Sequence, residues 1–508
     1  MTTRPMRKVL VANRGEIAVR VLRALRELGM RGAVAYSDAD RQSLPVRLAD
    51  EAYRIGPAPS RESYLRADAL VALAVEIGAD AIHPGYGFLS ENAAFARRCR
   101  EAGVTFIGPS PEAIAAMGSK IESRRRMIDA GVPVVPGGRD PLATLAEAEL
   151  AADGIGYPVM LKAASGGGGK GMRLVRARSE LAAAYRGARS EAQASFGDDT
   201  VYLEKYIERP RHVEIQILGD QHGNVVSLGE RECSLQRRHQ KVVEEAPSTA
   251  VTPDLRRRMG EAAVTAARAV GYSNAGTCEF LLAADGTFYF LEMNTRLQVE
   301  HPVTELVTGL DLVLAQLAIA QGEPLGPEFS GVEPRGHAIE MRLYAEDPFQ
   351  KFAPSPGRIH FLRWPQGPGV RIDAGVYEGA EVSVHYDPML AKLIVYGKDR
   401  TEALQRMGRA LRELRVEGIR TSAPLFRALL ADPEFLAADF DIAWLDRKLE
   451  SGALAPVPSE LPEDLPVIAA AIAHFEAAHR HTTQPSHAGA ARTRWRQAGR
   501  GDGSGRWS

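Results

Sequence analysis

Cysteine is scarce in this sequence, with three residues in 508. Cys99, Cys233 and Cys278 lie far apart and form no C-x-x-C pair. Their spacing excludes a disulfide-stapled domain and a cysteine zinc site, and it suits a reducing compartment. No run approaches about 18 apolar residues, and the N-terminus "MTTRPMRKVLVAN" holds only a four-residue apolar run. We therefore expect no membrane span, no signal peptide and a cytoplasmic protein.

An excess of one charge is also absent. Lys and Arg number 63 and Asp and Glu number 64, which gives a formal net charge of -1. No global field then favours nucleic acid or an anionic membrane, so neither is a predicted partner. Hydrophobic residues make up 45% and charged residues 25%, as in an ordinary globular protein. A length of 508 residues predicts about three domains.

Residues 1–117 show strands that alternate with helices. Buried strands are expected at residues 8–13, 32–38, 79–85 and 104–110, and amphipathic helices at 14–29 and 67–78. This alternation predicts a parallel, doubly wound sheet of the Rossmann-like α/β class. One further helix is expected over 111–131.

Beyond residue 117 the pattern changes to α+β. Residues 118–320 are rich in antiparallel strand signals, and residues 335–450 are mixed. Residues 455–508 are rich in Ala, Pro and polar side chains and predict a largely disordered tail.

A hairpin at 278–301 places two acidic residues together. If Asp285-Gly286 forms a two-residue turn, Ala284 faces Thr287 and Glu279 faces Glu292. Two carboxylates roughly 5 Å apart repel by about 3 kcal/mol at an effective dielectric near 20. A shared proton, a Lys or Arg, or a divalent cation could offset this repulsion.

Polar side chains continue along the second strand of the hairpin. In an extended segment they share one face: Glu292, Asn294, Arg296, Gln298 and Glu300. An exposed face with ion pairs is one interpretation. The facing glutamates and the neighbouring asparagine, another oxygen ligand, favour a metal site.

The glycine run "SGGGGKGM" at 165–172 formally fits G-x-G-x-x-G. A dinucleotide site needs a helix after the glycines, whereas 172–176 reads as a strand, and Lys170 does not fit P-loop spacing. What remains is a plain surface hairpin or a flap whose backbone N–H groups close over phosphates, as in kinases. Lys162 and Lys170 could place positive charge there.

Several stretches carry a resemblance to a known family. They are ANRGEIAVR, HPGYGFLSEN, GGGGKGM, RHVEIQ, ERECSLQRRHQKVVEEAP, EMNTRLQVEHPVTE, AEDP and SPG. The sequence resembles ATP-grasp enzymes and, more closely, biotin carboxylase, the ATP-dependent component of acetyl-CoA and related acyl-CoA carboxylases, in the setting of fatty acid biosynthesis. The resemblance spans about residues 7–450. It implies an ATP-grasp fold with an N-terminal domain, a central region with a mobile lid at 134–207, and a C-terminal domain.

The same resemblance implies the site residues. Magnesium or manganese ligands would be Glu279, Glu292 and Asn294. ATP contacts would be Lys120, Lys162, Gly168, Gly169, Glu204, Lys205, Tyr206, Ile207, His212, Gln236, His239, Glu279 and Glu292. The bicarbonate pocket would be Lys241, Arg296 and Val299, with Glu300 as the base and Arg342 against the ureido oxygen of biotin. "HPGYGFLSEN" is interpreted as a packing loop of the first domain, without a catalytic role.

The implied reaction uses ATP and bicarbonate to carboxylate biotin through carboxyphosphate. No Met-Lys-Met occurs in the chain, so biotin is expected on a separate carrier protein, with carboxyltransferase subunits as further partners and a homodimer as the assembly. Three alternatives stay open: another ATP-grasp ligase with an acyl-phosphate intermediate, a non-catalytic nucleotide-binding scaffold, and a dinucleotide-binding oxidoreductase.

Overall fold

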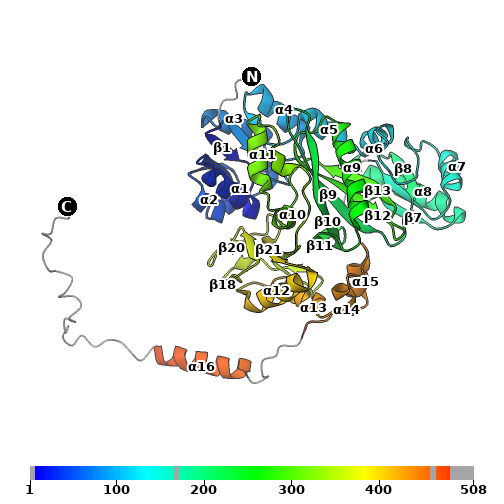
Figure 1. The fold of residues 1–508 in the computed structure, drawn as a ribbon. Helices are drawn as coiled ribbons and strands as arrows, with labels where there is room; N and C mark the ends of the chain where they lie inside the picture. The colour runs from blue at the N-terminus through cyan, green and yellow to red at the C-terminus, as the bar shows by residue number, and fades with distance from the viewer. Residues whose placement is uncertain (1–5, 165–170, 458–464, 481–508) are drawn as a thin grey trace, which may run out of the picture. The chain divides into compact units, whose positions relative to one another are not determined.

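The computed structural model describes residues 6–164, 171–457 and 465–480 (Figure 1). The described residues divide into two units, one that ends at Pro456 and one that begins at Val457. The predicted flap residues Gly168 and Gly169 lie outside the described residues, as does the chain end from 481.

The N-terminal segment folds into a parallel five-stranded sheet in the order β3-β2-β1-β4-β5. Its strands are β1 (Lys8–Val11), β2 (Arg31–Ser37), β3 (Glu51–Gly56), β4 (Ala81–His83) and β5 (Thr105–Phe106). The connecting helices are α1 (Gly15–Glu27), α2 (Leu44–Leu48), α3 (Ala67–Glu76) and α4 (Ala93–Glu101). In α1, Ile17, Val21 and Leu25 recur every four residues and are buried, as an amphipathic helix requires. The predicted doubly wound sheet is confirmed.

The single helix predicted over 111–131 is wrong. The structure has two helices there, α5 (Pro111–Gly118) and α6 (Lys120–Asp129). Ser119 between them has an extended backbone, and its hydroxyl accepts a hydrogen bond from the Glu122 N–H. Serine in this conformation starts a new helix because its side chain satisfies a free N–H. The break places Lys120 at the first position of α6, facing the cleft described below.

A small antiparallel sheet lies within the predicted lid segment 134–207. Its strands, in the order β7-β6-β8, are β6 (Val159–Ala163), β7 (Met172–Val175) and β8 (Val201–Lys205). Two helices pack with it, α7 (Leu145–Ile155) and α8 (Arg178–Phe196) (Figure 1). Lys162 pairs with Met172, so the glycine run joins two hairpin strands, as predicted. This sheet has a hydrophobic core of its own, and the lid role stays a prediction.

An eight-stranded sheet forms the centre of the unit that ends at Pro456. Its first strands along the chain are β9 (Arg211–Gly219), β10 (Val225–Arg237), β11 (Gln240–Ala246), β12 (Asn274–Leu282) and β13 (Phe288–Asn294). β14 (His337–Tyr344), β19 (Val370–Ala374) and β21 (Met389–Gly397) complete the order β13-β12-β9-β10-β11-β14-β21-β19. The sheet therefore runs across the boundary predicted between 118–320 and 335–450.

Helices cover this sheet. They are α9 (Pro253–Arg268), α10 (His301–Thr308), α11 (Leu312–Ala320), α12 (Arg400–Glu413), α13 (Ala423–Leu429), α14 (Pro433–Leu436) and α15 (Trp444–Glu450). Short strands flank its C-terminal part: β15 (Glu346–Asp347), β16 (Ala353–Pro354), β17 (Gly357–Arg358), β18 (Phe361–Arg363), β20 (Glu381–Val382) and β22 (Arg415–Glu417). The largest buried apolar cluster lies beneath β14, β21 and α12.

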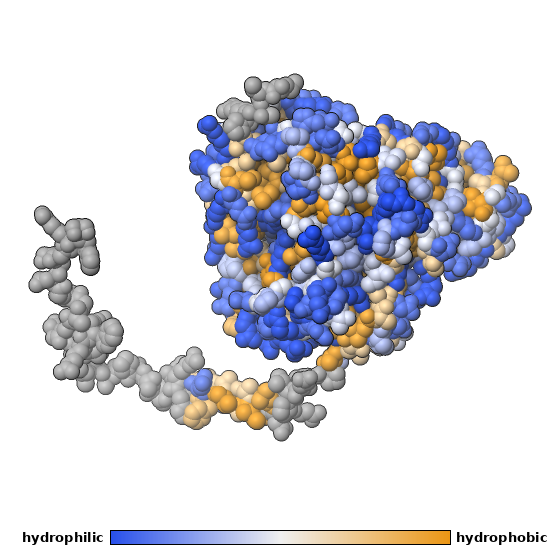
Figure 2. Space-filling model, in the orientation of Figure 1, coloured by the Kyte–Doolittle hydropathy of each residue, from blue (hydrophilic) through white to orange (hydrophobic). Residues whose placement is uncertain are grey.

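The predicted tail contains a helix that the composition did not indicate, α16 (Leu465–Arg480). Ile468, Ile472 and Phe475 are exposed along it. Figure 2 shows hydrophobic side chains on the surface of this helix. Across the described residues, no single helix has the length and apolar content needed to cross a membrane. Only α10 with α11, bent by 97°, pass that test of length and composition as a pair.

Candidate active site

A cleft of about 940 Å³ is lined by strands of both the eight-stranded sheet and the small sheet. Every predicted site residue that the structure describes lines it. These residues are Lys120, Lys162, Glu204, Lys205, Tyr206, Ile207, His212, Gln236, His239, Lys241, Glu279, Glu292, Asn294, Arg296, Val299, Glu300 and Arg342. Segments far apart in the sequence thus converge on one cavity.

The β12–β13 hairpin contains the predicted acidic pair, but its turn and its register differ from the prediction. Ala283 pairs with Thr287, so the turn has three residues and the predicted facing of Ala284 and Thr287 is wrong. Gly286 has a positive φ of 81°, as the last residue of such a turn requires. Beyond the turn Phe280 faces Phe290, and one extra residue on β13, a bulge, restores the pairing of Glu279 with Glu292.

Glu279 faces a second carboxylate on its other side. On β9, Glu214 is its direct cross-strand partner, so three glutamates lie in a row across β13, β12 and β9. The row ends at Arg231 on β10, which faces Glu214 and donates to it from Nε at 2.5 Å. The sequence reasoning did not identify Glu214. Its spacing of two residues from His212 in "RHVEIQ" was the available signal, because both side chains share one face of β9.

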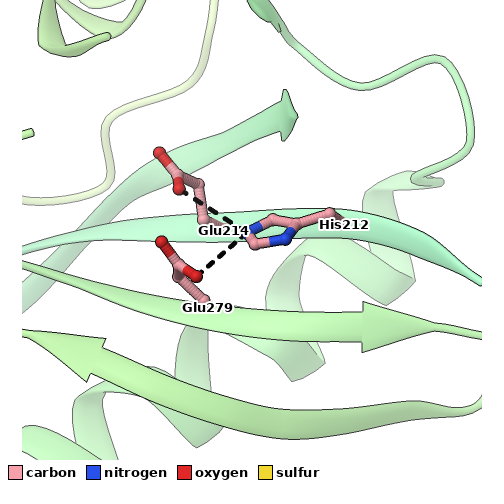
Figure 3. Close-up of side chains that lie close together, drawn as sticks. All are labelled: His212, Glu214 and Glu279. Carbon is pink, nitrogen blue, oxygen red and sulfur yellow. Dashed lines mark ion pairs between the residues drawn. The ribbon is translucent and has the colours of Figure 1, made fainter. Parts of the chain in front are cut away.

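Figure 3 shows the Glu214 and Glu279 carboxylates turned toward the His212 imidazole. The His212 Nε2 lies 3.2 Å from a Glu279 oxygen and 3.9 Å from a Glu214 oxygen. Burial alone would raise the pKa of Glu279, but Lys241 and His212 hold it well below its ordinary value. Glu279 is therefore a carboxylate that is already paired with the Lys241 ammonium group.

Glu292 differs, because it is exposed in the cleft and forms no ion pair with any described residue. The charge on Glu279 raises the pKa of Glu292, and partial removal from bulk water adds to the shift, while Lys120 opposes it. The predicted repulsion between the two glutamates is thus present. Among residues 6–164, 171–457 and 465–480, no cationic side chain lies within ion-pair distance of Glu292 to offset this repulsion.

Lys241 lies at the centre of the charged cluster. Its Nζ is 2.5 Å from Glu214, 2.9 Å from Glu279 and 2.8 Å from Glu300. Burial would lower the pKa of this lysine, but the three carboxylates raise it well above the ordinary value. The ammonium group occupies the space between Glu214 and Glu279, which are two of the acidic groups that could otherwise share a metal with His212.

Glu300 links Lys241 to Arg342. One Glu300 oxygen is 2.8 Å from Lys241 Nζ, and the other accepts from Arg342 Nη2 at 3.0 Å. Arg342 also donates from Nε to Glu244 at 2.6 Å. Burial would raise the pKa of Glu300, but Lys241, Arg342 and Arg231 keep it well below its usual range. Glu300 is therefore ionised and able to accept a proton once these cations turn to another anion.

Arg296 lies at the edge of the cleft in a segment that is not a strand. β13 ends at Asn294, so the extended face predicted through Glu300 is wrong beyond that residue. The side chains still converge, because Arg296 donates to Asn294 at 2.9 Å and to Gln298 at 2.5 Å. α10 begins just after, at His301.

Glu91 belongs to the site, contrary to the interpretation of its loop as packing alone. It pairs with Arg296 Nε at 3.0 Å and accepts from the Thr295 N–H at 3.0 Å. Its loop, "HPGYGFLSEN", lies in the N-terminal segment, yet Glu91 lines the cleft. A charged residue in a turn-rich motif was the signal that could have indicated it.

Two lysines approach the cleft from the side of the small sheet. Lys162 on β6 forms a close ion pair with Glu204 on β8, and Arg124 lies 3.8 Å from the same carboxyl group. Burial lowers the pKa of Lys120, and Glu292 opposes that effect. These side chains can hold anionic phosphate oxygens as point charges.

Two other residues predicted to contact the nucleotide, Lys205 and Gln236, form hydrogen bonds within the protein through their side chains. Lys205 donates from Nζ to the carbonyls of Gly156 and Tyr157, at 2.9 and 3.1 Å. Gln236 donates to the Cys233 carbonyl at 2.9 Å and lies 3.1 Å from His212 Nδ1. The Lys205 ammonium group therefore already has two backbone acceptors.

Comparison with known families covers most of the chain. Residues 5–114 match the family described as "Biotin carboxylase, N-terminal domain", and residues 340–447 match "Biotin carboxylase C-terminal domain". Residues 119–328 match "Carbamoyl-phosphate synthase L chain, ATP binding domain". The three matches follow one another without overlap.

Individual relatives agree. A biotin carboxylase of Halalkalibacterium halodurans is 53% identical over 87% of this chain and 98% of its own. A biotin carboxylase of Nostoc is 53% identical over 86% of this chain and 98% of its own. A solved structure of the biotin carboxylase domain dimer of Hydrogenobacter thermophilus 2-oxoglutarate carboxylase contains MgADP, ADP and bicarbonate. It superposes on this chain with a TM-score of 0.84 and 46% identity, and the match covers 90% of this chain and 100% of that one. The chain therefore belongs to the biotin carboxylase family of ATP-dependent ligases with the ATP-grasp fold.

Proposed function

We propose that the cleft uses ATP and bicarbonate to carboxylate biotin held on a separate carrier protein. The observation that carries the proposal is the charged cluster around Lys241, which joins the acidic row of Glu214, Glu279 and Glu292 to Glu300 and Arg342. A solvated surface face would not bury this many charges in one cavity. The family and the solved relative with MgADP and bicarbonate support the same reaction.

A magnesium or manganese ion fits beside Glu279 and Glu292. The residues present offer hard oxygen donors, two carboxylates and the Asn294 amide, which such ions prefer. Glu292 needs a counter-charge that no described residue supplies within 4 Å. When bound, the ion would neutralise charge on the transferring phosphoryl group. In this proposal Lys120 and Lys162 hold the phosphate oxygens, and the segment from Glu204 to Ile207 contacts the adenine.

Bicarbonate binding is proposed for Lys241, Arg296 and Val299. The lysine and arginine supply fixed positive charge that holds the anion in line with the γ-phosphate. An anion that draws Lys241 away from Glu300 removes the main cation that lowers the pKa of Glu300. Glu300 then becomes a better base and takes the bicarbonate proton as carboxyphosphate forms.

Biotin is proposed to bind next to Arg342. Carboxyphosphate breaks down to CO2 and phosphate, the phosphate takes the proton from the biotin nitrogen, and the nitrogen attacks CO2. Arg342 stabilises the negative charge that develops on the ureido oxygen. Glu244, 2.6 Å from Arg342 Nε, holds the guanidinium in place.

The proposal also covers assembly and location. It includes a homodimer, a biotinyl carrier protein and a separate carboxyltransferase, in the cytoplasm. The solved relative from Hydrogenobacter thermophilus is a dimer, and the free, buried Cys99, Cys233 and Cys278 suit a reducing compartment. The acceptor of the carboxyl group is the partner's choice, because relatives of similar identity belong to pyruvate and methylcrotonoyl-CoA carboxylases.

The direct test is ATP hydrolysis that requires bicarbonate and rises with free biotin. We expect both dependences. Stimulation by ammonia or an amine without a biotin response would instead indicate another ATP-grasp ligase, and the absence of any turnover with intact ATP binding would indicate a scaffold.

A further inference from the structure

The turn between β10 and β11 has an unfavourable backbone. Arg237 pairs with Gln240, which leaves Arg238 and His239 as the two central residues of the turn. Both have positive φ, 47° and 66°. Glycine and asparagine favour this region and histidine enters it more often than most residues, whereas arginine rarely adopts it, so the surrounding structure must hold the turn at Arg238 in place.

Three contacts from beyond residue 340 hold this turn. The Arg237 guanidinium lies over the Phe352 ring at 3.6 Å. Gln240 donates to the Tyr344 hydroxyl at 3.1 Å, and the Arg238 N–H donates to Asp446 at 3.2 Å. The β10–β11 turn is thus anchored by the C-terminal part of the chain.

Phe352 itself sits in a second strained turn. Lys351 and Phe352 have φ of 55° and 58°, and the turn closes with a 3.0 Å hydrogen bond from the Ala353 N–H to the Gln350 carbonyl. Arg237 forms no ion pair within 4 Å with any residue the structure describes. The Phe352 ring lies against its guanidinium, and the Glu346 and Asp446 carboxylates act on it from farther away. Burial lowers the pKa of Arg237, and a guanidinium removed from water gains more from an aromatic face.

We propose that Arg237 and Phe352 act together as positioning residues for the nucleotide, by holding the β10–β11 turn so that His239 faces the cleft. The proposal rests on the proposed function, because it takes the cleft to be the ATP site. His239 and Gln240 line the cleft, while Arg237 and Phe352 do not. Neither side chain of the pair therefore needs to touch the ligand for ATP affinity to depend on it.

The test compares Arg237→Met and Phe352→Leu, which remove the charge or the ring and keep apolar bulk. ATP affinity is measured by calorimetry on the full chain, and KM for ATP, KM for bicarbonate and kcat by steady-state kinetics. We expect ATP binding to weaken about fivefold in each variant, with KM for bicarbonate unchanged. The double variant should be no weaker than either single one, because one contact is lost in all three.

Conservative variants and a matched control complete the test. Arg237→Lys and Phe352→Tyr keep a cation and a ring, and they should stay within about twofold of the wild type. Arg47→Met removes a similar contact, 4.0 Å over Tyr377 on the surface, and should change nothing. Wild-type ATP affinity in Arg237→Met, or an equal loss of ATP and bicarbonate affinity, would overturn the proposal. The calorimetric result decides this even if the wild type shows no biotin response, which would count against the proposed function alone.

Discussion

Two regions of this chain have features that nucleotide sites use, and the cleft described above lies at the second of them. The N-terminal sheet reverses its strand order between β1 and β4, where ligands of doubly wound sheets bind. The eight-stranded sheet is antiparallel around β9 and β12, without that topology, yet it lines the cleft.

Side chains and a neighbouring turn fill the N-terminal position. Asn13 donates to the carbonyls of Pro84 and Tyr86 at 2.6 and 2.8 Å. Gly375, just after β19, packs its backbone on the first turn of α1, where an added Cβ would lie 2.6 Å from the Glu16 nitrogen. The start of α1 is therefore a packing surface. A reversal of strand order marks a binding position only where the chain leaves space beside it.

The largest expected effect is at Glu300 and Arg296. Glu300→Ala and Arg296→Ala remove the proposed base and one bicarbonate cation, so turnover should fall by about 10²- to 10⁴-fold. ATP binding should persist, because Lys120 and Lys162 remain. Steady-state ATP hydrolysis with a parallel ATP titration measures both, and turnover that survives either change would contradict the assigned roles.

Removing the central cation of the cleft should have the next largest effect. Lys241→Met leaves Glu214, Glu279 and Glu300 without their shared ammonium group, and breaking such buried pairs costs about 3–5 kcal/mol. The free energy of unfolding from urea titration should fall by that order, together with activity. A stable variant would show that the three carboxylates do not depend on Lys241.

Glu16 tests the charges of the N-terminal region. Burial raises the pKa of Glu16 to about 7, with Lys392 opposing. The folded state then holds a proton that the unfolded chain releases above its pKa of 4.5, so stability is lost as pH rises from 4.5 to 7, by up to about 3 kcal/mol. Glu16→Gln should lack this loss, and ATP affinity should not change. A stability difference between the two proteins that is flat with pH would show Glu16 to be ionised.

The smallest effect should follow from Gly375→Ala. The added Cβ meets backbone atoms of Gly15 and Glu16, so stability should fall by about 1–3 kcal/mol through overpacking. Gly187→Ala in α8 is the control, because its nearest atom would be 3.7 Å away. KM for ATP should stay unchanged in both. A matching loss of ATP affinity in Gly375→Ala would mean that the N-terminal region contributes to the nucleotide site.

Sequence patterns predicted the doubly wound sheet and the facing of Glu279 and Glu292, but not the details between them. The hairpin prediction reached the right pair because two local features cancel: a three-residue turn shifts the register by one, and a bulge beyond Phe290 shifts it back. Neither feature leaves a mark in the alternation of polar and apolar residues. The break at Ser119 was not predicted for a similar reason. The hydrogen bond from the Glu122 N–H to the Ser119 side chain starts a new helix, but the residues on both sides keep a continuous helical pattern.

Contacts between segments far apart in the sequence were also not predicted. Glu91 pairs with Arg296 across 205 positions, and Glu214 meets Glu279 only because β9 and β12 are neighbours in the sheet. Spacing along one strand cannot show which strands lie side by side. The family resemblance predicted residues that line the cleft, whereas the row of Glu214, Glu279 and Glu292 became visible only from the order of the strands in the sheet.

Transfer of labelled bicarbonate to free biotin is the direct test of the reaction proposed for this cleft. In the presence of ATP and Mg²⁺, the wild type and Gly375→Ala should both form labelled carboxybiotin, and Glu300→Ala should form it about 10²- to 10⁴-fold more slowly. Label in biotin at the wild-type rate from Glu300→Ala, or none from the folded wild type, would contradict the assignment of the reaction to this cleft.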